Sequence, residues 1–363
     1  MKKLALLLGS LLVVGATASA KEAVVAPVEV SKEVVVVADV VEEVVVEEAF
    51  RPSGYVGLQY KAFGNTEGHG DTIATDALDA VLDSQDTWNR GANNYSRLET
   101  SFGIQVTEKF KFEGRIRDYN NLDRNDESSD TDYKEDGTET RLRFSYKHSD
   151  MFTSRFQYRD EENDSQNFEY VLFTNLYKNN GGLLSSLYVA PVLYHSMPKD
   201  GGGRYYNKLE LEFGYAGNLP LGFTYSGTLG FEEFFYNYDN FVTNSNGRKK
   251  DKEFNLNWEF EVFRTFALYT AENYNLDLNL SGGYDDYNFS QYAQYVGTEK
   301  KYDKDRYSLY GAADLTLTYQ VTPALSVNGG IGAEYRNWDN ENQSSANDWR
   351  WQPFAFAGMT AKF

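Results

Sequence analysis

The sequence predicts an all-β protein: a transmembrane, antiparallel, up-and-down β-barrel of about 14 strands (12–16), preceded by a Val/Glu-rich N-terminal segment. Three observations support this prediction. From residue 54 onward, segments of about 9–13 residues alternate apolar and polar side chains with a period of two, which is the pattern of a strand with two different faces. The connections between these segments alternate between short and long. The sequence also ends on an aromatic residue, Phe363.

Composition excludes several other classes. Hydrophobic residues make up 41% of the chain and charged residues 25%, which fits neither a disordered tail nor a helical membrane protein. The absence of cysteine excludes a disulfide scaffold and a thiolate metal site. The 28 Tyr and 24 Phe favour strands. The 30 Gly beside only 7 Pro fit a protein made mostly of strands. The formal net charge of -19 argues against a nucleic-acid partner.

Residues 1–20 are predicted to be a secretory signal peptide. Lys2 and Lys3 form a basic start, an apolar run follows, and Ala18 and Ala20 form a small-residue cleavage site. The weaker alternative is a membrane helix, because the apolar run is shorter than the ~20 residues that a spanning helix needs. We therefore expect an exported protein.

Residues 21–50 form a segment of biased composition. Thirteen of its residues are valine and eight are acidic. The valine clusters suit an amphipathic helix, although valine is a mediocre helix former. One interpretation is a periplasmic segment or linker. The other is a helix that plugs the lumen, self-associates or contacts the cell wall, and the sequence leaves both open.

Residues 51–363 are predicted to form the barrel. Its clearest alternating segments are 56–62, 98–106, 110–117, 141–147, 152–159, 208–215, 253–262, 275–281, 308–319 and 326–336. Less regular strands are expected near 167–177, 184–195, 223–235 and 349–363. An even number of strands places both ends of the barrel on the same side of the membrane.

The connections predict which rim of the barrel carries the large loops. Short turns are expected at 107–109, 148–151, 178–182, 217–221 and 320–324. Long polar loops are expected at about 64–93, 120–138, 196–204, 237–251, 286–304 and 338–348. A soluble β-sandwich would not alternate turn lengths so regularly. A closed barrel in the bacterial outer membrane gives the apolar face lipid and the polar face water, and it leaves no unpaired edge.

Aromatic residues near strand ends suit the girdles of a membrane barrel. Trp349, Trp351, Tyr319 and Tyr335 are the clearest of these. The final strand, with Gly358, Ala361 and Phe363, is similar to the signal that the outer-membrane barrel assembly machinery reads, so this machinery is an expected partner.

The polar faces of the strands predict a lumen with two charged walls. Early strands carry a basic wall of Arg97, Lys111, Arg115, Arg117, Arg141, Arg143, Lys147, Arg155 and Arg159. Later strands carry an acidic wall of Glu210, Glu212, Glu232, Glu253, Glu259, Glu261 and Asp277. Because consecutive strands are neighbours, these walls would face each other and create a transverse field. The alternative is that the charges only solvate the lumen and pair across strands.

Several sequence motifs resemble the fusobacterial major outer-membrane porins (FomA-like). They are the opening MKKLALLLGSLLVVGATASAKE, ETRLRF from Glu139, GGYDDYN from Gly282, EYRN from Glu334, and WRWQP followed by AGM and the final Phe. The resemblance covers both ends and scattered strands, and it is weak in the long loops. It implies a voltage-sensitive general-diffusion porin, a homotrimer, and loops that can act in adhesion. No site residue carries over from it.

Two functions remain open. The first is a porin that passes ions and small hydrophilic solutes, and the second is a barrel-anchored adhesin whose loops, 64–93 above all, bind host or bacterial surface ligands. An enzyme is not expected, because His69, His148 and His195 lack metal-ligand spacing and no nucleophile elbow is present. No cofactor or metal is expected either, since the acidic run 123–136 lacks the glycine of an EF-hand. Loose bridging of divalent cations between acidic loops and lipopolysaccharide stays open.

Overall fold

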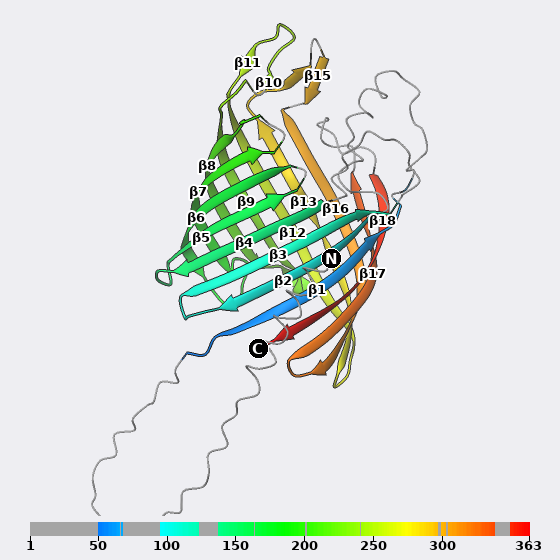
Figure 1. Ribbon diagram of the computed structural model, residues 1–363. Helices are drawn as coiled ribbons and strands as arrows, with labels where there is room; N and C mark the ends of the chain where they lie inside the picture. The colour runs from blue at the N-terminus through cyan, green and yellow to red at the C-terminus, as the bar shows by residue number, and fades with distance from the viewer. Residues whose placement is uncertain are drawn as a thin grey trace, which may run out of the picture.

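A closed antiparallel barrel forms the body of the protein in the computed structural model (Figure 1). The structure describes residues 50–65, 67, 95–122, 137–162, 164–199, 202–239, 241–296, 299–302, 304–337 and 349–363. The barrel strands are β1 Ser53–Phe63, β2 Tyr95–Gln105, β3 Phe110–Asn121, β4 Gly137–Lys147, β5 Phe152–Glu161, β6 Ser165–Lys178, β7 Ser186–Pro198, β8 Tyr206–Asn218, β9 Thr224–Tyr236, β12 Lys252–Thr270, β13 Tyr274–Ser290, β16 Asp305–Thr322, β17 Leu325–Asn337 and β18 Trp349–Lys362. These 14 strands confirm the predicted fold class and strand number.

The last barrel strand pairs with the first and so closes the sheet. β1 and β18 run antiparallel, with Leu58 opposite Met359. At the end of this ladder, Gly54 and Phe363 exchange both backbone hydrogen bonds, at 2.8 and 3.0 Å. Closure satisfies the backbone groups that an open sheet would leave unpaired at its edges.

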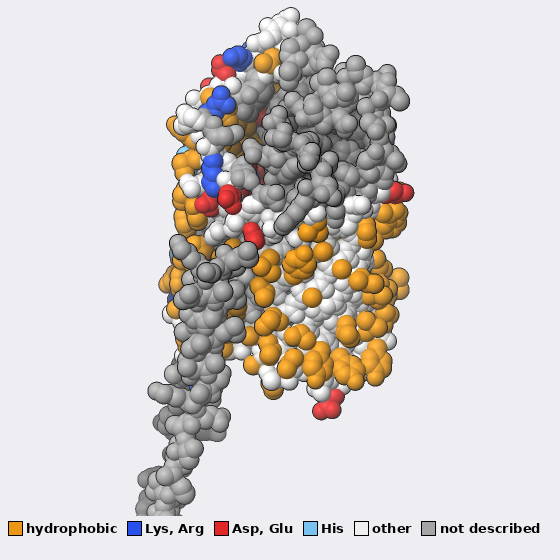
Figure 2. All heavy atoms as spheres, turned by 45° about the vertical axis from the view of Figure 1, so that its right-hand side comes forward, with side chains coloured by type: hydrophobic (Ala, Val, Ile, Leu, Met, Phe, Trp, Pro, Cys, Tyr) orange, Lys and Arg blue, Asp and Glu red, His pale blue; other side chains and the backbone are white. Residues whose placement is uncertain are grey.

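The two faces of the sheet differ as the alternation predicts. Charged side chains such as Glu139 and Glu232, each 5% exposed, are buried on one face. Large apolar side chains such as Phe144 and Leu209 are exposed on the other, at 37% and 47%. A single closed sheet can bury a charge only inside the barrel, so the apolar face is the outer one. Figure 2 shows this apolar belt around the lower part of the molecule.

The connections correct the predicted loops in three places. Residues 162–164 join β5 to β6 by a short turn on the rim that was expected to carry long loops. β13 runs to Ser290, into the predicted loop 286–304. The loops after β9 and β13 contain β10 Phe241–Val242, β11 Lys249–Lys250, β14 Gln294–Val296 and β15 Glu299–Tyr302. These form a small sheet beyond the barrel (Figure 1), because the long strands β12, β13 and β16 continue past the ends of their neighbours.

Aromatic rings gather at both rims. Tyr335 stacks on Trp351 at 4.6 Å between ring centroids near the rim with the long connections, which is the extracellular rim of such barrels. Tyr274 and Tyr319 lie 6.1 Å apart near the opposite, periplasmic rim. An apolar belt between aromatic rims around an even-stranded closed barrel is the architecture of the bacterial outer membrane. The protein is a bacterial outer-membrane β-barrel.

Several predictions fall on segments outside the described residues. These are the signal peptide with Ala18 and Ala20, the segment 21–50 apart from Phe50, most of loop 64–93, the acidic run 123–136 and the loop 338–348. In the part of the chain that the structure describes, no helix is long and apolar enough to cross a membrane.

Candidate functional site in the barrel lumen

The predicted basic residues all lie at inward positions on β2 to β5. The cross-strand register fixes this, because each pairs with inward partners, as Arg117 does with Glu99 and Glu139. Lys147 is inward at the periplasmic end, where its Nζ lies 2.5 Å from Asp150 Oδ1. The nine residues therefore share one wall of the lumen.

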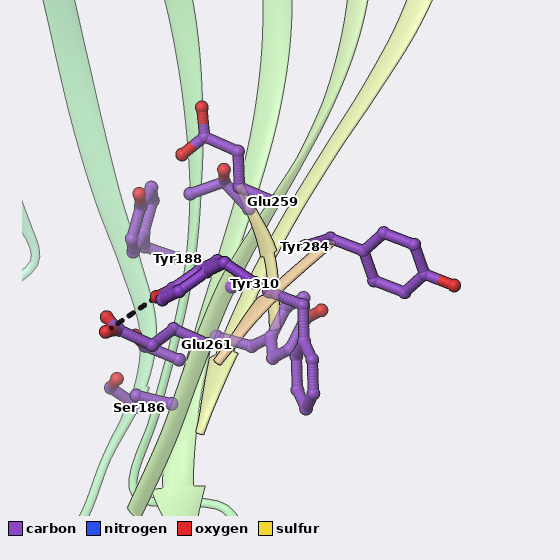
Figure 3. A pocket seen from close by; sticks show the side chains of 12 residues that line it. Ser186, Tyr188, Glu259, Glu261, Tyr284 and Tyr310 are labelled. Carbon is purple, nitrogen blue, oxygen red and sulfur yellow. Dashed lines mark hydrogen bonds between the residues drawn. The ribbon is translucent and has the colours of Figure 1, made fainter. Parts of the chain in front are cut away.

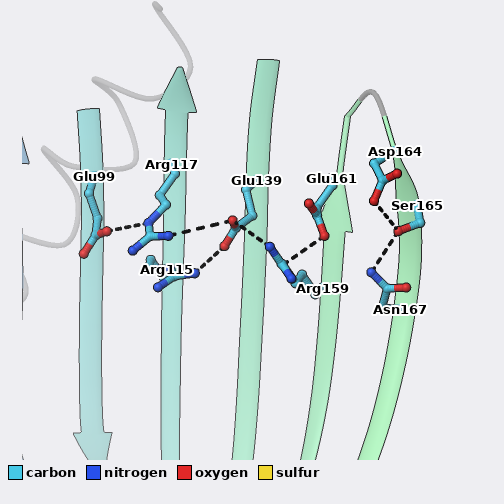
Figure 4. Close-up of polar contacts among 9 residues, drawn as sticks. All are labelled: Glu99, Arg115, Arg117, Glu139, Arg159, Glu161, Asp164, Ser165 and Asn167. Atoms are coloured by element: carbon cyan, nitrogen blue, oxygen red, sulfur yellow. Dashed lines mark hydrogen bonds and ion pairs between the residues drawn. The ribbon is translucent and has the colours of Figure 1, made fainter. Parts of the chain in front are cut away.

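Carboxylates interleave with the arginines of this wall (Figure 4). Glu139 on β4 binds Arg115 and also lies 3.2 Å from Arg159 and 3.9 Å from Arg117. Arg117 donates from Nε to Glu99 on β2 at 2.6 Å. One carboxylate thus joins arginines of β3 and β5, and Glu99 extends the network to β2.

Two carboxylates of this wall do not stand out in the sequence. Glu161 lies 3.1 Å from Arg159, and Glu169 on β6 lies 2.8 Å from Arg155. Glu161 is the last residue of β5, and Glu169 falls on one of the irregular strands, so neither stood out in the alternation. Arg97 and Arg141 have no carboxylate within ion-pair distance among the described residues.

The predicted acidic residues also share an inward face, on β8, β9, β12 and β13. Glu210 and Glu232 lie directly opposite each other across β8 and β9. Lys208 lies between them, with Nζ at 2.8 Å from Glu210 and 2.6 Å from Glu232. Glu212 accepts a hydrogen bond of 2.7 Å from the hydroxyl of Tyr188. The remaining members of this wall are Glu253, Glu259, Glu261 and Asp277.

Two further carboxylates extend the acidic wall beyond the prediction. Asp314 on β16 pairs with Asn279, and Glu334 on β17 lies 2.6 Å from the Nε of Arg336. Both fall within predicted alternating segments, 308–319 and 326–336, but neither belongs to the predicted acidic wall. The acidic wall therefore continues from β8 to β17.

A pocket of about 300 Å³ opens on the acidic wall (Figure 3). Tyr310 donates a hydrogen bond of 2.9 Å to Glu261, and Tyr188 approaches the same region from β7. Tyr284 belongs to the outer face and points away from this group. The inward lining is Ser186, Tyr188, Ala216, Ser226, Thr228, Glu259, Glu261 and Tyr310.

The order of the strands places the two walls opposite each other. β3 and β12 are seven strands apart in either direction around the ring, as are β4 and β13. Arg115 and Arg117 on β3 therefore face the strand that carries Glu259 and Glu261. Cations on one side and carboxylates on the other point into the same lumen.

Apolar side chains complete the lumen between the charged walls. Val171, Ala190 and Val192 are buried on the inward faces of β6 and β7. Phe354 and Phe356 on β18 also point inward, because they pair with Gly332 and Gly330 of β17 on the same face as Glu334. The simple rule that apolar residues face lipid misses these positions.

The other residues singled out in the sequence lie away from the charged walls. Gly358 pairs with Gln59 in the closing ladder, where Ala361 and Phe363 also lie. His148 contacts Ser154 at 2.9 Å in a periplasmic turn, and His195 contacts Asn207 at 2.9 Å on the outer face. Neither histidine has the surroundings of a catalytic base or metal ligand.

Comparison with solved structures finds outer-membrane proteins of low sequence identity. No protein-family model matches the sequence, and no curated protein matches it. A bacterial polysaccharide outer membrane secretin shares 9% identity at a TM-score of 0.42, covering 85% of this chain and 98% of its own. OmpT of Vibrio cholerae shares 9% identity at a TM-score of 0.34, and the match covers 86% of this chain and 97% of OmpT. Pseudomonas aeruginosa OprD shares 9% identity at a TM-score of 0.33, and the match covers 86% of this chain and 95% of OprD. The resemblance to the fusobacterial porins stays a prediction.

Proposed function

We propose that the protein is a general-diffusion porin that passes ions and small hydrophilic solutes through its charged lumen. The opposition of a basic wall on β2–β5 and an acidic wall on β8–β13 is the observation that supports this. Opposed charges orient water across the lumen, which slows apolar solutes while ions and polar solutes pass. An anchor that only held loops at the surface would not need two charged walls inside.

The size of the barrel is compatible with an open lumen. Barrels of eight strands are filled by side chains, whereas barrels of 16–18 strands leave an aqueous channel. Fourteen strands lie between these cases. The side chains of the two walls then set the effective width.

Single-channel conductance in a planar bilayer tests the proposal. The refolded mature protein should give discrete current steps, and the reversal potential in a salt gradient reports which wall controls selectivity. A folded, heat-modifiable barrel that gives no conductance would overturn the porin proposal and direct attention to residues 21–50 as a plug.

Adhesion is the second candidate function, and the small sheet of β10, β11, β14 and β15 favours it. This sheet projects beyond the barrel on the extracellular side, where a binding surface would have to lie. Replacing residues 238–250 by a short turn should abolish attachment to a cell or ligand-coated surface and leave conductance unchanged. Loop 64–93 is the other candidate for the same experiment.

Three further expectations belong to the porin proposal. They are voltage-dependent closure, assembly as a homotrimer, and contact of the extracellular rim with lipopolysaccharide. Voltage ramps on the reconstituted channel test the first. The native mass of the detergent-extracted protein, with and without bound lipopolysaccharide, tests the other two.

A further inference from the structure

Two cations lie side by side near the extracellular end of the lumen, outside the paired network of the basic wall. Lys61 on β1 lies directly opposite Arg97 on β2, and both are inward. Among the described residues, neither has a carboxylate within ion-pair distance. The Nε of Arg97 is buried and has no hydrogen-bond partner. Like charges directly opposite each other destabilise a strand pair, so this arrangement has a cost that calls for an explanation.

Aromatic rings hold Lys61 in place without neutralising it. Its Nζ lies 3.8 Å from the ring centroid of Phe354 and 4.5 Å from that of Phe63. The attraction between an ammonium group and a ring face is electrostatic but leaves the net positive charge intact. Lys61 is therefore positioned by its neighbours and still available to an anion.

The ring of Phe354 is positioned in turn by a glycine. A Cβ on Gly332 of β17 would come within about 2.5 Å of the Phe354 ring, so the ring lies against bare backbone. Gly330 supports Phe356 in the same way. This leaves the rings flat along the wall of the lumen.

A stack of rings continues from this group past Arg97. Phe63 and Tyr95 are parallel within 6°, with centroids 4.3 Å apart. Tyr119, directly opposite Arg97 on β3, lies 6.4 Å from Tyr95. All three rings are half-buried, so each keeps part of its surface toward the lumen. Two unpaired cations thus stand beside an apolar, flat surface.

We propose that Lys61, Arg97, Phe63, Tyr95 and Phe354 form a binding site for small organic carboxylates with a flat apolar body, such as aromatic carboxylates. The inference rests on the porin proposal, because the solute reaches this site through the lumen. The carboxylate would take the guanidinium of Arg97 and the ammonium of Lys61, whose donors suit its two oxygens. The flat body would lie against the rings. The site lies near the entrance, since Phe63 ends β1 and Tyr95 begins β2.

Current block in single channels tests this site with phenylacetate, cyclohexylacetate and acetate added to the extracellular side. Phenylacetate should block at a concentration roughly tenfold lower than acetate and lower than cyclohexylacetate, whose ring is not flat. Lys61→Gln and Arg97→Gln should each remove this preference. Phe354→Leu should weaken block by phenylacetate more than it weakens block by acetate, because it removes a flat surface as well as one of the rings that position Lys61.

Lys111→Gln is the matched control, because Lys111 belongs to the same basic wall but is paired with Glu113 at 2.7 Å. It should leave the preference intact. Equal block by phenylacetate and acetate, or equal effects of Lys61→Gln and Lys111→Gln, would overturn the site while leaving the porin proposal standing.

Calorimetric titration of the detergent-folded barrel with phenylacetate reads the same site without a current. A folded barrel that binds phenylacetate but gives no conductance would contradict the porin proposal and leave the carboxylate site standing. A conducting channel for which this titration detects no binding would contradict the carboxylate site alone.

Discussion

The two charged walls of the lumen differ in how repulsion between like charges is reduced. On the basic wall, carboxylates are inserted among the arginines, and Glu139 alone lies within ion-pair distance of Arg115, Arg117 and Arg159. On the acidic wall, Glu212 and Glu261 each accept a hydrogen bond from a tyrosine hydroxyl, which carries no charge. The basic wall therefore neutralises much of its own field, whereas the acidic wall, in which Lys208 pairs with Glu210 and Glu232, keeps more of its charge.

This difference has a consequence for selectivity. Arg115, Arg117 and Arg159 are fixed in a network that spans β2 to β5, so their positions are well defined but their net charge is reduced. The carboxylates of the acidic wall have fewer counter-charges, and the side chains of two of these, Lys208 and Arg336, are each 17% exposed. We therefore expect the intact channel to select only weakly between cations and anions, because the arginines of the basic wall offset the carboxylates of the acidic wall.

The largest effect is expected on ion selectivity when arginines of the basic wall are removed. Replacing Arg115, Arg117, Arg141 and Arg143 together by Ala would remove four of the nine cations of the basic wall and leave Glu139 with Arg159 as its remaining ion-pair partner, while the acidic wall stays complete. The cation-to-anion permeability ratio, measured from the reversal potential in a salt gradient, should rise by roughly tenfold.

Retained heat-modifiability of this variant would show that the barrel still folds. Selectivity that is indifferent to the loss of the arginines would mean that the charges only solvate the lumen, and it would contradict the transverse field.

An effect of intermediate size is expected on the free energy of unfolding, which should fall more when a carboxylate of the basic wall is replaced than when one of the acidic wall is replaced. Glu139→Gln leaves three arginines without their shared carboxylate, and we expect a loss of about 2 kcal/mol of unfolding free energy, discounted because Arg159 is 37% exposed. Glu261→Gln changes a single hydrogen bond from Tyr310, so its loss should be about 1 kcal/mol or less. Urea titration of the two variants in the same lipid gives both values, and losses of equal size would contradict the contrast between the walls.

The smallest effect is expected at the periplasmic mouth of the basic wall. There the hydrogen bond and charge of Lys147 hold the pKa of Asp150 below its ordinary value of 3.8. Such a depressed pKa favours the folded state above pH 3.8, and this contribution is lost as the pH falls through the depressed value. Lys147→Gln should raise the pKa of Asp150 in a carboxyl NMR titration.

Asp150 is fully exposed, so the same substitution should leave the urea midpoint at neutral pH unchanged. A clear change in that midpoint would show that charge pairs at the mouth matter as much as those inside the lumen.

The sequence predicted the barrel because strand alternation is a local property. Arg115 and Glu259 could be assigned to the polar side from their immediate neighbours alone. Their opposition across the lumen followed from the rule that consecutive strands pair. Both steps need only short-range information.

Other features depended on contacts that the alternation does not contain. Glu169 completes the basic wall from β6, where Val171 is also inward, so the apolar and polar faces are mixed there. Phe354 points inward because Gly332 of the neighbouring strand leaves room for its ring. The strands β10 and β14 lie far apart in sequence and meet only where the longest barrel strands carry them past the rim. Each of these depends on a neighbour that the local pattern does not specify.

The ladder between β1 and β18 has a consequence for how the barrel is made. Every other ladder of the barrel joins barrel strands that follow one another along the chain. Each such strand can pair with the preceding one as a hairpin while the sheet forms. The pairing of Gly54 with Phe363 joins the most distant residues of the barrel. The entropy of closing one very long loop is therefore concentrated in this ladder, and contacts of that kind are slow to form. We expect the ring to remain an open ribbon for most of its folding time and to become a channel in a single final step.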